Sequence, residues 1–285
     1  MRRTDCLHGE ALVMRSELAS WRAPESAAEP DDGVTFTLLG PLEVVKDGVN
    51  YAPSAPKILQ LLAMLLMRPG KVVQIDSIIQ ELWADDPPRS VRTTMQTYVY
   101  QLRKCIEKNE LAPDGEDLLI TRAPGYLFKV DPAQIDVTLF QQLCQQGRES
   151  MAARRHAEAA TSFRSALALW TGAPLANVNC GSLLSAYAVD LQEQMRAAQQ
   201  LRIQAEIEGG NHRELIGELK FLVSANPLDE GLHGQLMQVL SRSGRRSDAM
   251  AIYRQLRSRL HAELGVEPCD ELQLLHHGLL SAGET

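Results

Sequence analysis

The chain has 285 residues, of which 45% are hydrophobic, and a formal net charge of −7 at pH 7. This length accommodates two domains of ordinary size, while the acidic balance excludes the strongly basic composition of many nucleic-acid-binding proteins. No apolar run approaches the roughly 20 residues of a membrane span, and no export signal opens the chain. The five cysteines are scattered without metal-ligand spacing, as is typical of reduced thiols. We therefore expect a cytoplasmic protein with no metal and no cofactor.

Motifs of common enzyme classes are missing from the sequence. It contains neither the GxxxxGK[ST] loop nor the GxGxxG loop that cradle phosphates. His276 and His277 are adjacent, so on a helix their side chains diverge by about 100° and do not form an i, i+4 metal pair. The remaining histidines, serines and cysteines show no nucleophile-base pattern. We expect no enzymatic activity and assign no catalytic residue.

In chain order, residues 1–33 come first, rich in Ala, Pro, Glu and Asp, and are predicted to form a flexible N-terminal arm. Residues 34–53 carry short runs of β-branched and aromatic residues. Because Gly40-Pro41 and Asp47-Gly48 punctuate these runs, they predict a small antiparallel strand set.

An apolar helix is expected next, capped by Ser54 and ending at Pro69-Gly70. A second, shorter helix is expected from Gln74 to Trp83. The loop after it leads to the most informative segment, which runs from Arg89 to Glu107.

Read as a helix at about 100° per residue, residues 89–107 have two well-separated faces. The core-facing residues are Val91, Met95, Val99, Leu102 and Ile106, and the outward-facing residues are Ser90, Thr93, Thr97, Tyr100, Gln101 and Lys104. Residues 89–108 contain five cations against Glu107 alone, within a segment (34–130) that carries 11 charges of each sign. Hydroxyls, an amide and cations without a carboxylate suit a helix that meets phosphates and base edges in a groove. The alternative is a cationic helix on a solvated surface.

Two further strands, at residues 118–122 and 126–130, are predicted to form a hairpin joined by Ala123-Pro124-Gly125. Strands, three helices and this hairpin make a winged helix-turn-helix over residues 34–130. In that fold the third helix reads the major groove and the hairpin, or wing (118–130), contacts the DNA backbone. The leading strands and the wing resemble the DNA-binding domain of OmpR-type response regulators, whose arginine, glycine-bearing turn and tyrosine are matched by Arg122, Gly125 and Tyr126.

Residues 131–285 are predicted to be all helical. Ala159 precedes Phe163 by four residues, and Ala249 precedes Tyr253 in the same way, a spacing typical of tetratricopeptide-like helix pairs. A long helix from about residue 183 to 208 is expected to interrupt the array. Such pairs stack into a superhelix whose concave side binds proteins or peptides; a generic helical bundle is the alternative. The fold class expected is mixed and mainly α.

The segment from Trp170 to Leu175 (Trp-x-Gly-x-Pro-Leu) and the run ending in Glu-Leu-Gly-Val-Glu-Pro (263–268) resemble the bacterial transcriptional activation domain. A winged helix before that domain is the layout of the Streptomyces antibiotic regulatory proteins, and residues 92–104 are similar to that family's recognition helix. The resemblance covers about residues 34–281.

This resemblance implies a pathway-specific transcriptional activator of a secondary-metabolite (antibiotic) gene cluster, associated with the nucleoid. It implies that two protomers bind side by side on direct repeats of double-stranded DNA near the promoter −35 region. It further implies recruitment of RNA polymerase holoenzyme through the housekeeping sigma factor and core subunits. No receiver domain precedes the winged helix, so switching by aspartate phosphorylation is not expected.

The DNA-contact candidates fall into groove and phosphate sets. The groove candidates are Thr93, Thr97, Gln101 and Lys104, since amides pair with adenine edges and threonine methyls touch thymine methyls. The phosphate candidates are Arg89, Arg92, Tyr100, Arg103, Lys104 and Arg122. Thr94 lies at the flank of the helix face, and Tyr126 enters through the wing resemblance.

Asp85 and Asp86 lie in the loop that the family uses to meet polymerase, where acidic residues could attract a basic sigma surface. A solvated turn is the alternative for this pair. For the whole protein, the alternatives are a helical-repeat adaptor whose winged helix binds protein, and a repressor that uses the same DNA contact. The cationic, carboxylate-poor face of residues 89–104 favours DNA over a protein partner.

Overall fold

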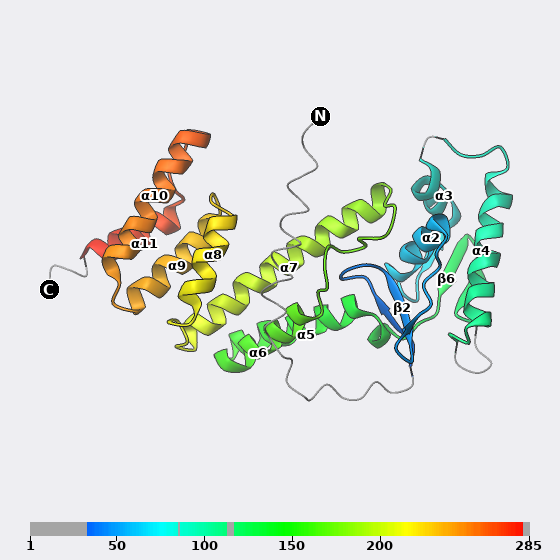
Figure 1. Cartoon of the computed structure of the whole chain (residues 1–285), viewed down its shortest axis with the longest axis horizontal. Helices are drawn as coiled ribbons and strands as arrows, with labels where there is room; N and C mark the ends of the chain where they lie inside the picture. The colour runs from blue at the N-terminus through cyan, green and yellow to red at the C-terminus, as the bar shows by residue number, and fades with distance from the viewer. Residues whose placement is uncertain (1–32, 85, 113–116, 282–285) are drawn as a thin grey trace. The chain divides into compact units, whose positions relative to one another are not determined.

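The computed structural model describes residues 33–84, 86–112 and 117–281 (Figure 1). They form two compact units: the first contains the chain up to Gln142 together with Ala168–Gln194, and the second contains Leu143–Leu167 and the chain from Met195 onward. Among the described helices, none is long and apolar enough to cross a membrane. The predicted arm, apart from Gly33, lies outside the described residues.

The first unit opens with a three-stranded antiparallel sheet, β1 (Thr35–Thr37), β2 (Glu43–Lys46) and β3 (Val49–Asn50), in that order. The hairpin between β2 and β3 turns at Asp47 and Gly48, which have φ values of 51° and 74°. Asp-Gly is a favoured pair for turns with two positive φ angles, so the predicted strand set is confirmed at the turn that its sequence specifies.

Helix α2 (Pro56–Leu66) forms the core of this unit. All of its residues from Ile58 to Leu66 are buried, which explains why every residue of this stretch except Gln60 is apolar. Its N-cap is Ala55, without a side-chain cap hydrogen bond, so the prediction that Ser54 caps the helix is wrong. Pro56 instead occupies the first helical turn, where its missing N–H has no intrahelical partner to lose.

The helix-turn-helix and wing come next as β4 (Val72–Gln74), α3 (Ile75–Trp83), α4 (Val91–Lys108), β5 (Leu119–Arg122) and β6 (Gly125–Phe128). The second sheet has the order β4-β6-β5, all antiparallel. Strand β4 was not predicted, because three residues are too short to show a β alternation. Its pairing with β6 makes β6 the central strand, and all four β6 residues are buried.

The loop between β1 and β2 is held by residues far along the chain. The Asp136 carboxylate, at the start of α5 (Asp136–Ala152), accepts hydrogen bonds of 2.8–2.9 Å from the backbone N–H groups of Leu38 and Leu39. The Asn177 amide accepts from the Leu42 N–H at 2.7 Å and donates to the Leu42 carbonyl at 3.0 Å. Thr171 N–H donates to the Leu39 carbonyl at 2.9 Å. Segment 168–194 therefore belongs structurally with the strands and α2–α4.

The second unit is helical throughout its described residues. It contains the end of α5, most of α6 (His156–Ala168), the C-terminal part of α7 (Ser182–Glu208), and then α8 (Leu215–Ala225), α9 (Glu230–Arg242), α10 (Arg246–Leu264) and α11 (Asp270–Ser281). The alanine-aromatic pairs predicted from sequence are buried: Ala159 and Phe163 are fully inaccessible, as is Ala249, and Tyr253 is 7% exposed. The predicted long helix is α7, with nearly the expected limits.

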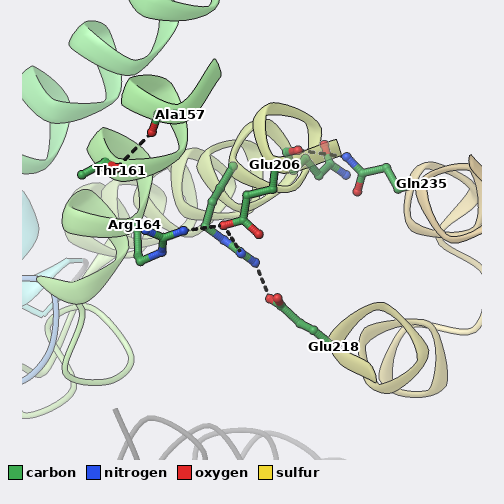
Figure 2. A network of polar contacts seen from close by, with 8 residues as sticks. Ala157, Thr161, Arg164, Glu206, Glu218 and Gln235 are labelled. Atoms are coloured by element: carbon green, nitrogen blue, oxygen red, sulfur yellow. Dashed lines mark hydrogen bonds and ion pairs between the residues drawn. The ribbon is translucent and has the colours of Figure 1, made fainter. Parts of the chain in front are cut away.

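Four charged side chains join α6, α7 and α8 (Figure 2). Arg164 Nη2 lies 2.9 Å from Glu206 Oε1, the same oxygen lies 3.1 Å from Arg202 Nη1, and Arg202 also bonds Glu218. Arg202 and Glu206 are each only 8% exposed. Because cation and anion alternate along the chain of contacts, each buried charge has an opposite partner, which offsets the cost of its desolvation.

Candidate nucleic-acid interface

Helix α4 is placed by its apolar face. Met95, Val99, Leu102 and Ile106 are 1–8% exposed, and Val91 in the first turn is half-buried. Trp83 of α3 stacks on Tyr98 of α4, with ring centroids 5.9 Å apart. These contacts fix the rotation of α4 about its axis and thereby turn its polar face outward.

The predicted outer face of α4 is exposed in the structure. The exposed candidates on it are Arg92, Thr93, Thr97, Tyr100, Gln101, Arg103 and Lys104, and Arg89 is exposed just before the helix. Tyr100 keeps 58% of its surface accessible. Lys104 Nζ lies 5.8 Å from the centre of the Tyr100 ring and 3.8 Å from Glu107 Oε2. Because both partners of that ion pair are well exposed, the pair contributes little and leaves the ammonium available to a phosphate.

Two threonines of this helix use their hydroxyls locally. Thr97 Oγ1 donates to the Thr93 carbonyl at 3.0 Å, and Thr94 Oγ1 donates to the Ser90 carbonyl at 3.2 Å. A hydroxyl that donates to the preceding turn still accepts through its lone pairs, and the threonine methyl stays available for apolar contact. Thr94 is half-buried, whereas Thr93 and Thr97 are exposed, so Thr94 lies at the flank of the outer face.

Arg103 is exposed but already has partners on the wing. Its Nε and Nη2 donate to the Leu119 carbonyl at 3.2 and 3.0 Å, and Nη2 also reaches Thr121 Oγ1 at 2.8 Å. The guanidinium thus ties α4 to strand β5. The two N–H donors on Nη1 take no part in these bonds, so Arg103 serves first to align helix and wing.

The two candidate DNA-contact residues of the wing differ in exposure. Arg122 is exposed on β5 and pairs with Gly125 at the hairpin end. Tyr126 is 5% exposed on the central strand β6, so the prediction that Tyr126 contacts DNA is wrong. Gly125 is required by a close approach: a Cβ there would lie 1.8 Å from the Val73 carbonyl oxygen of β4.

The loop between α3 and α4 is described at all its residues except Asp85, whose predicted role therefore lies outside the described residues. Asp86 is exposed, and its N–H donates to the Trp83 carbonyl at 3.0 Å. Ala84 leaves α3 with φ 48° and ψ −115°, a conformation rare for a residue with a Cβ. Within the described part of the chain, no three His, Cys, Asp or Glu side chains cluster as metal ligands.

Sequence reasoning missed Glu81. This carboxylate is 2% exposed on α3 and accepts hydrogen bonds from the backbone of residues 181–184. A signal was present: Glu81 lies three residues after Ile78 and beside Leu82, on the apolar side of the helix, where an unpaired charge is costly.

A helix with a cationic polar face, fixed by α2 and α3 and flanked by a three-stranded wing, defines a winged-helix DNA-binding transcriptional regulator. The chain matches the family described as "Transcriptional regulatory protein, C terminal" over residues 52–128 and "Bacterial transcriptional activator domain" over residues 135–280. It belongs to the Streptomyces antibiotic regulatory protein family. Neither of its two family domains is enzymatic.

Relatives cover nearly the whole chain. "Regulatory protein DnrI" of Streptomyces peucetius is 36% identical over 250 residues, which are 87% of this chain and 92% of the relative. "Regulatory protein AfsR" of Streptomyces griseus is 33% identical over 95% of this chain, but the chain spans only 27% of that relative. The solved structure of Mycobacterium tuberculosis EmbR in complex with a low affinity phosphopeptide has a TM-score of 0.82 at 30% identity and covers 88% of this chain and 66% of that one.

Proposed function

We propose that this protein is a pathway-specific activator of a secondary-metabolite gene cluster, which binds direct repeats near the promoter −35 region and recruits RNA polymerase. The observation that carries the DNA part is the exposed outer face of α4, which holds cations, hydroxyls and an amide. The similarity to DnrI supports a regulator that is specific for one such gene cluster. Repression through the same contact is the competing outcome, and the location of the repeats decides between them.

On DNA, α4 enters the major groove, and Gln101 faces base edges with Thr97 and Thr93 about one and two turns before it on the same helix face. Gln offers paired donor and acceptor groups to adenine. Arg89, Arg92, Tyr100 and Lys104 contact phosphates along the groove walls, and Arg122 contacts the backbone from the wing. Arg103 supports this set through its bonds to β5, and Thr94 contributes only at the edge.

Two protomers on direct repeats place equivalent α4 helices on the same side of the duplex, about one helical turn or 10–10.5 base pairs apart. The loop between α3 and α4, with Asp86 exposed and Asp85 beside it in sequence, faces polymerase. Acidic residues there complement a basic surface of the housekeeping sigma factor and speed its encounter. These steps place the protein in the cytoplasm, on the nucleoid.

The first test is a salt-titrated gel shift on upstream regions of the protein's own gene neighbourhood. Arg92→Ala and Lys104→Ala are expected to weaken binding to all sequences and to reduce the slope of log K against log salt by about 1 each. Gln101→Ala is expected to relax sequence preference at one position, at a cost of about 1–3 kcal/mol on the preferred site. Lys220→Ala, which removes an exposed cation of α8, is the matched control.

Unchanged salt slopes in both cation variants would exclude their phosphate contacts. Recruitment is tested by transcription with purified polymerase on templates whose repeat spacing is increased by about half a helical turn, or 5 base pairs. Activation is expected to disappear on the shifted template, while a fall in transcription on the native template identifies a repressor.

A further inference from the structure

Glu81 sits at the point where the helix-turn-helix meets the segment matched by the activator-domain family. Its side chain is buried in the last turn of α3, at 2% exposure. Oε1 accepts hydrogen bonds from the N–H groups of Gly181 at 2.6 Å and Leu184 at 3.3 Å, and Oε2 accepts from Leu183 at 2.8 Å. Both carboxylate oxygens are therefore used on one partner, the start of α7.

Glu81 binds the N-terminus of helix α7, where backbone N–H groups need an acceptor. The first N–H groups of α7 have no intrahelical acceptor, and the helix dipole favours a negative charge at this end. Gly181 permits the approach, since a Cβ there would lie 2.6 Å from the Glu81 carbonyl oxygen and 2.8 Å from its carboxylate carbon. Because the carboxylate has three donors in a dry environment, it is held in one position.

The last turn of α3 is also hydrogen-bonded to α2. Gln60 Nε2 donates to the Glu81 carbonyl at 2.9 Å in a buried contact. Lys57 Nζ donates to the carbonyl of the next residue, Leu82. Residues 81–82 are thus hydrogen-bonded both to α2 and to the start of α7.

The loop that leads to α4 begins directly after this turn. The chain leaves α3 through Ala84, whose positive φ persists only where its surroundings fix it. Trp83, two residues after Glu81, both accepts the Asp86 N–H and stacks on Tyr98 of α4. The position of the last turn of α3 therefore determines where the loop begins, whereas α4 is also held by its four buried apolar residues.

We propose that Glu81 is a positioning residue through which the activator-domain segment 181–184 fixes the loop between α3 and α4 in the form that meets polymerase. The polymerase role of the loop rests on the proposed function; the positioning of the loop does not. Glu81 is buried and is not one of the exposed side chains on the outer face of α4. Its loss therefore uncouples DNA binding, which persists, from activation, which falls.

Two variants break the contact from its two sides in the full-length chain. Glu81→Gln presents an NH₂ group to backbone donors, and Gly181→Ala inserts a methyl group between the two segments. The matched control is Asp136→Asn, a half-buried carboxylate of the same unit whose backbone donors, Leu38, Leu39 and Val137, lie outside α3 and α7. Comparing variants of similar melting temperature separates positioning from general destabilisation.

The measurement is amide hydrogen exchange, with DNA affinity and transcription alongside. Exchange of the last turn of α3 and of Asp86, whose N–H donates to the Trp83 carbonyl, is expected to rise about tenfold or more in Glu81→Gln and Gly181→Ala, and to stay within about threefold of wild type in Asp136→Asn. DNA affinity is expected to stay within about threefold in all three. At saturating DNA occupancy, transcription is expected to fall about tenfold in the first two variants only.

Unaltered exchange in Glu81→Gln and Gly181→Ala, or an equal rise in Asp136→Asn, overturns the positioning role. Wild-type transcription from fully occupied DNA in both variants overturns its link to polymerase. If wild-type protein itself neither binds nor activates, the proposed function fails, and the exchange data still decide whether Glu81 positions the loop.

Discussion

Arg122 and Tyr126 are close on the wing, yet only one of them faces solvent. Arg122 lies on the edge strand β5 and is exposed, whereas Tyr126 lies on β6, between β4 and β5, and is 5% exposed. A central strand covered on both sides buries every residue. Resemblance to a family wing grouped the two positions together but could not distinguish an exposed side chain from one packed inside the wing.

Tyr126 is therefore expected to affect stability and not recognition. Tyr126→Phe should keep the DNA affinity and salt slope of wild type, since the ring stays in place. Tyr126→Ala should lower the free energy of unfolding by about 3–5 kcal/mol, as for other large aromatic residues removed from a core. Urea unfolding and gel shifts on the same preparations check both; a Phe variant with a lost DNA contact would restore the original assignment.

His233 gives the helical unit a pH dependence. It is 3% exposed, and its Nδ1 lies 2.8 Å from the Asp229 carbonyl oxygen. Burial lowers the pKa of His233 below its ordinary value of 6.5, an effect that Arg259 adds to and that Asp229 and Glu230 oppose. The folded state thus binds the proton less readily than the unfolded state. The corresponding stability is complete above pH 6.5 and is lost as the pH falls through 6.5 toward the lower folded pKa.

We expect the free energy of unfolding to fall between pH 7.5 and pH 5, measured by urea titration at each pH. His233→Gln should be less dependent on pH over that range. Part of the dependence should remain, because the pKa of His276 is lowered in the same direction by burial and by neighbouring cations. If the free energy of unfolding changes equally with pH in the variant and in wild type, His233 does not contribute to the pH dependence.

Among the elements, the wing depends on one glycine. Gly125 pairs with Gln74 of β4 and with Arg122 of β5, and its Cα faces the Val73 carbonyl. Gly125→Ala is expected to cost about 1–3 kcal/mol of stability, because the added methyl overlaps the β4 backbone and fits only if β4 moves away. DNA affinity should fall as well, since β4 and β6 separate and the wing shifts.

Gly172→Ala is the control for that substitution, because a Cβ at residue 172 meets nothing within 4 Å. Urea unfolding and gel shifts compare the two. Equal stability of the two variants would show that β4 can yield, and that Gly125 serves only the hairpin turn.

Elements with strong local signals were predictable from sequence. The polar and apolar faces of α4 follow from helical periodicity, the β2–β3 turn from Asp47-Gly48, and the long α7 from its uninterrupted helical composition. Strand β4 was not predictable, since its existence depends on pairing with β6, about 50 residues away in sequence. The cap at Ser54 failed because Pro56 already starts the helix.

In the candidate site, too, features that depend on local sequence were predictable and long-range contacts were not. The outward residues of α4 depend on the helical period alone, so their exposure agrees with the prediction. The partners of Arg103 on β5 and the burial of Glu81 against residues 181–184 depend on long-range packing. No local pattern encodes such contacts, although a carboxylate on an apolar helix face is a warning that one exists.

At the scale of the whole molecule, the first compact unit crosses the limit between the two family domains. The division into residues 34–130 and 131–285 stays a prediction. The loop Leu38–Leu42 receives its hydrogen bonds from Asp136, Thr171 and Asn177, all beyond residue 130. The three leucines of this loop are fully buried, so we expect residues after 130 to be needed to keep them from solvent.

A fragment of residues 33–130 is therefore expected to melt several degrees below the full-length chain and to bind a dye specific for exposed apolar surface. Each lost backbone hydrogen bond contributes about 0.5–1.5 kcal/mol, and about 1 kcal/mol shifts the melting temperature of a domain this small by 4–8 °C. Calorimetry of fragment and full chain compares them. If the fragment is as stable as the full-length chain, the hydrogen bonds from residues after 130 do not stabilise the winged-helix fold.

The chain of Arg164, Glu206, Arg202 and Glu218 constrains how this family can diverge. Replacing Arg202 or Glu206 alone leaves the other, at 8% exposure, with one ion-pair partner in place of two, and breaking a buried pair costs up to about 3–5 kcal/mol. Viable change at these positions must therefore come in pairs, so they should covary among homologues. Chimeras that exchange α6, α7 or α8 singly between relatives should fail unless the four residues travel together.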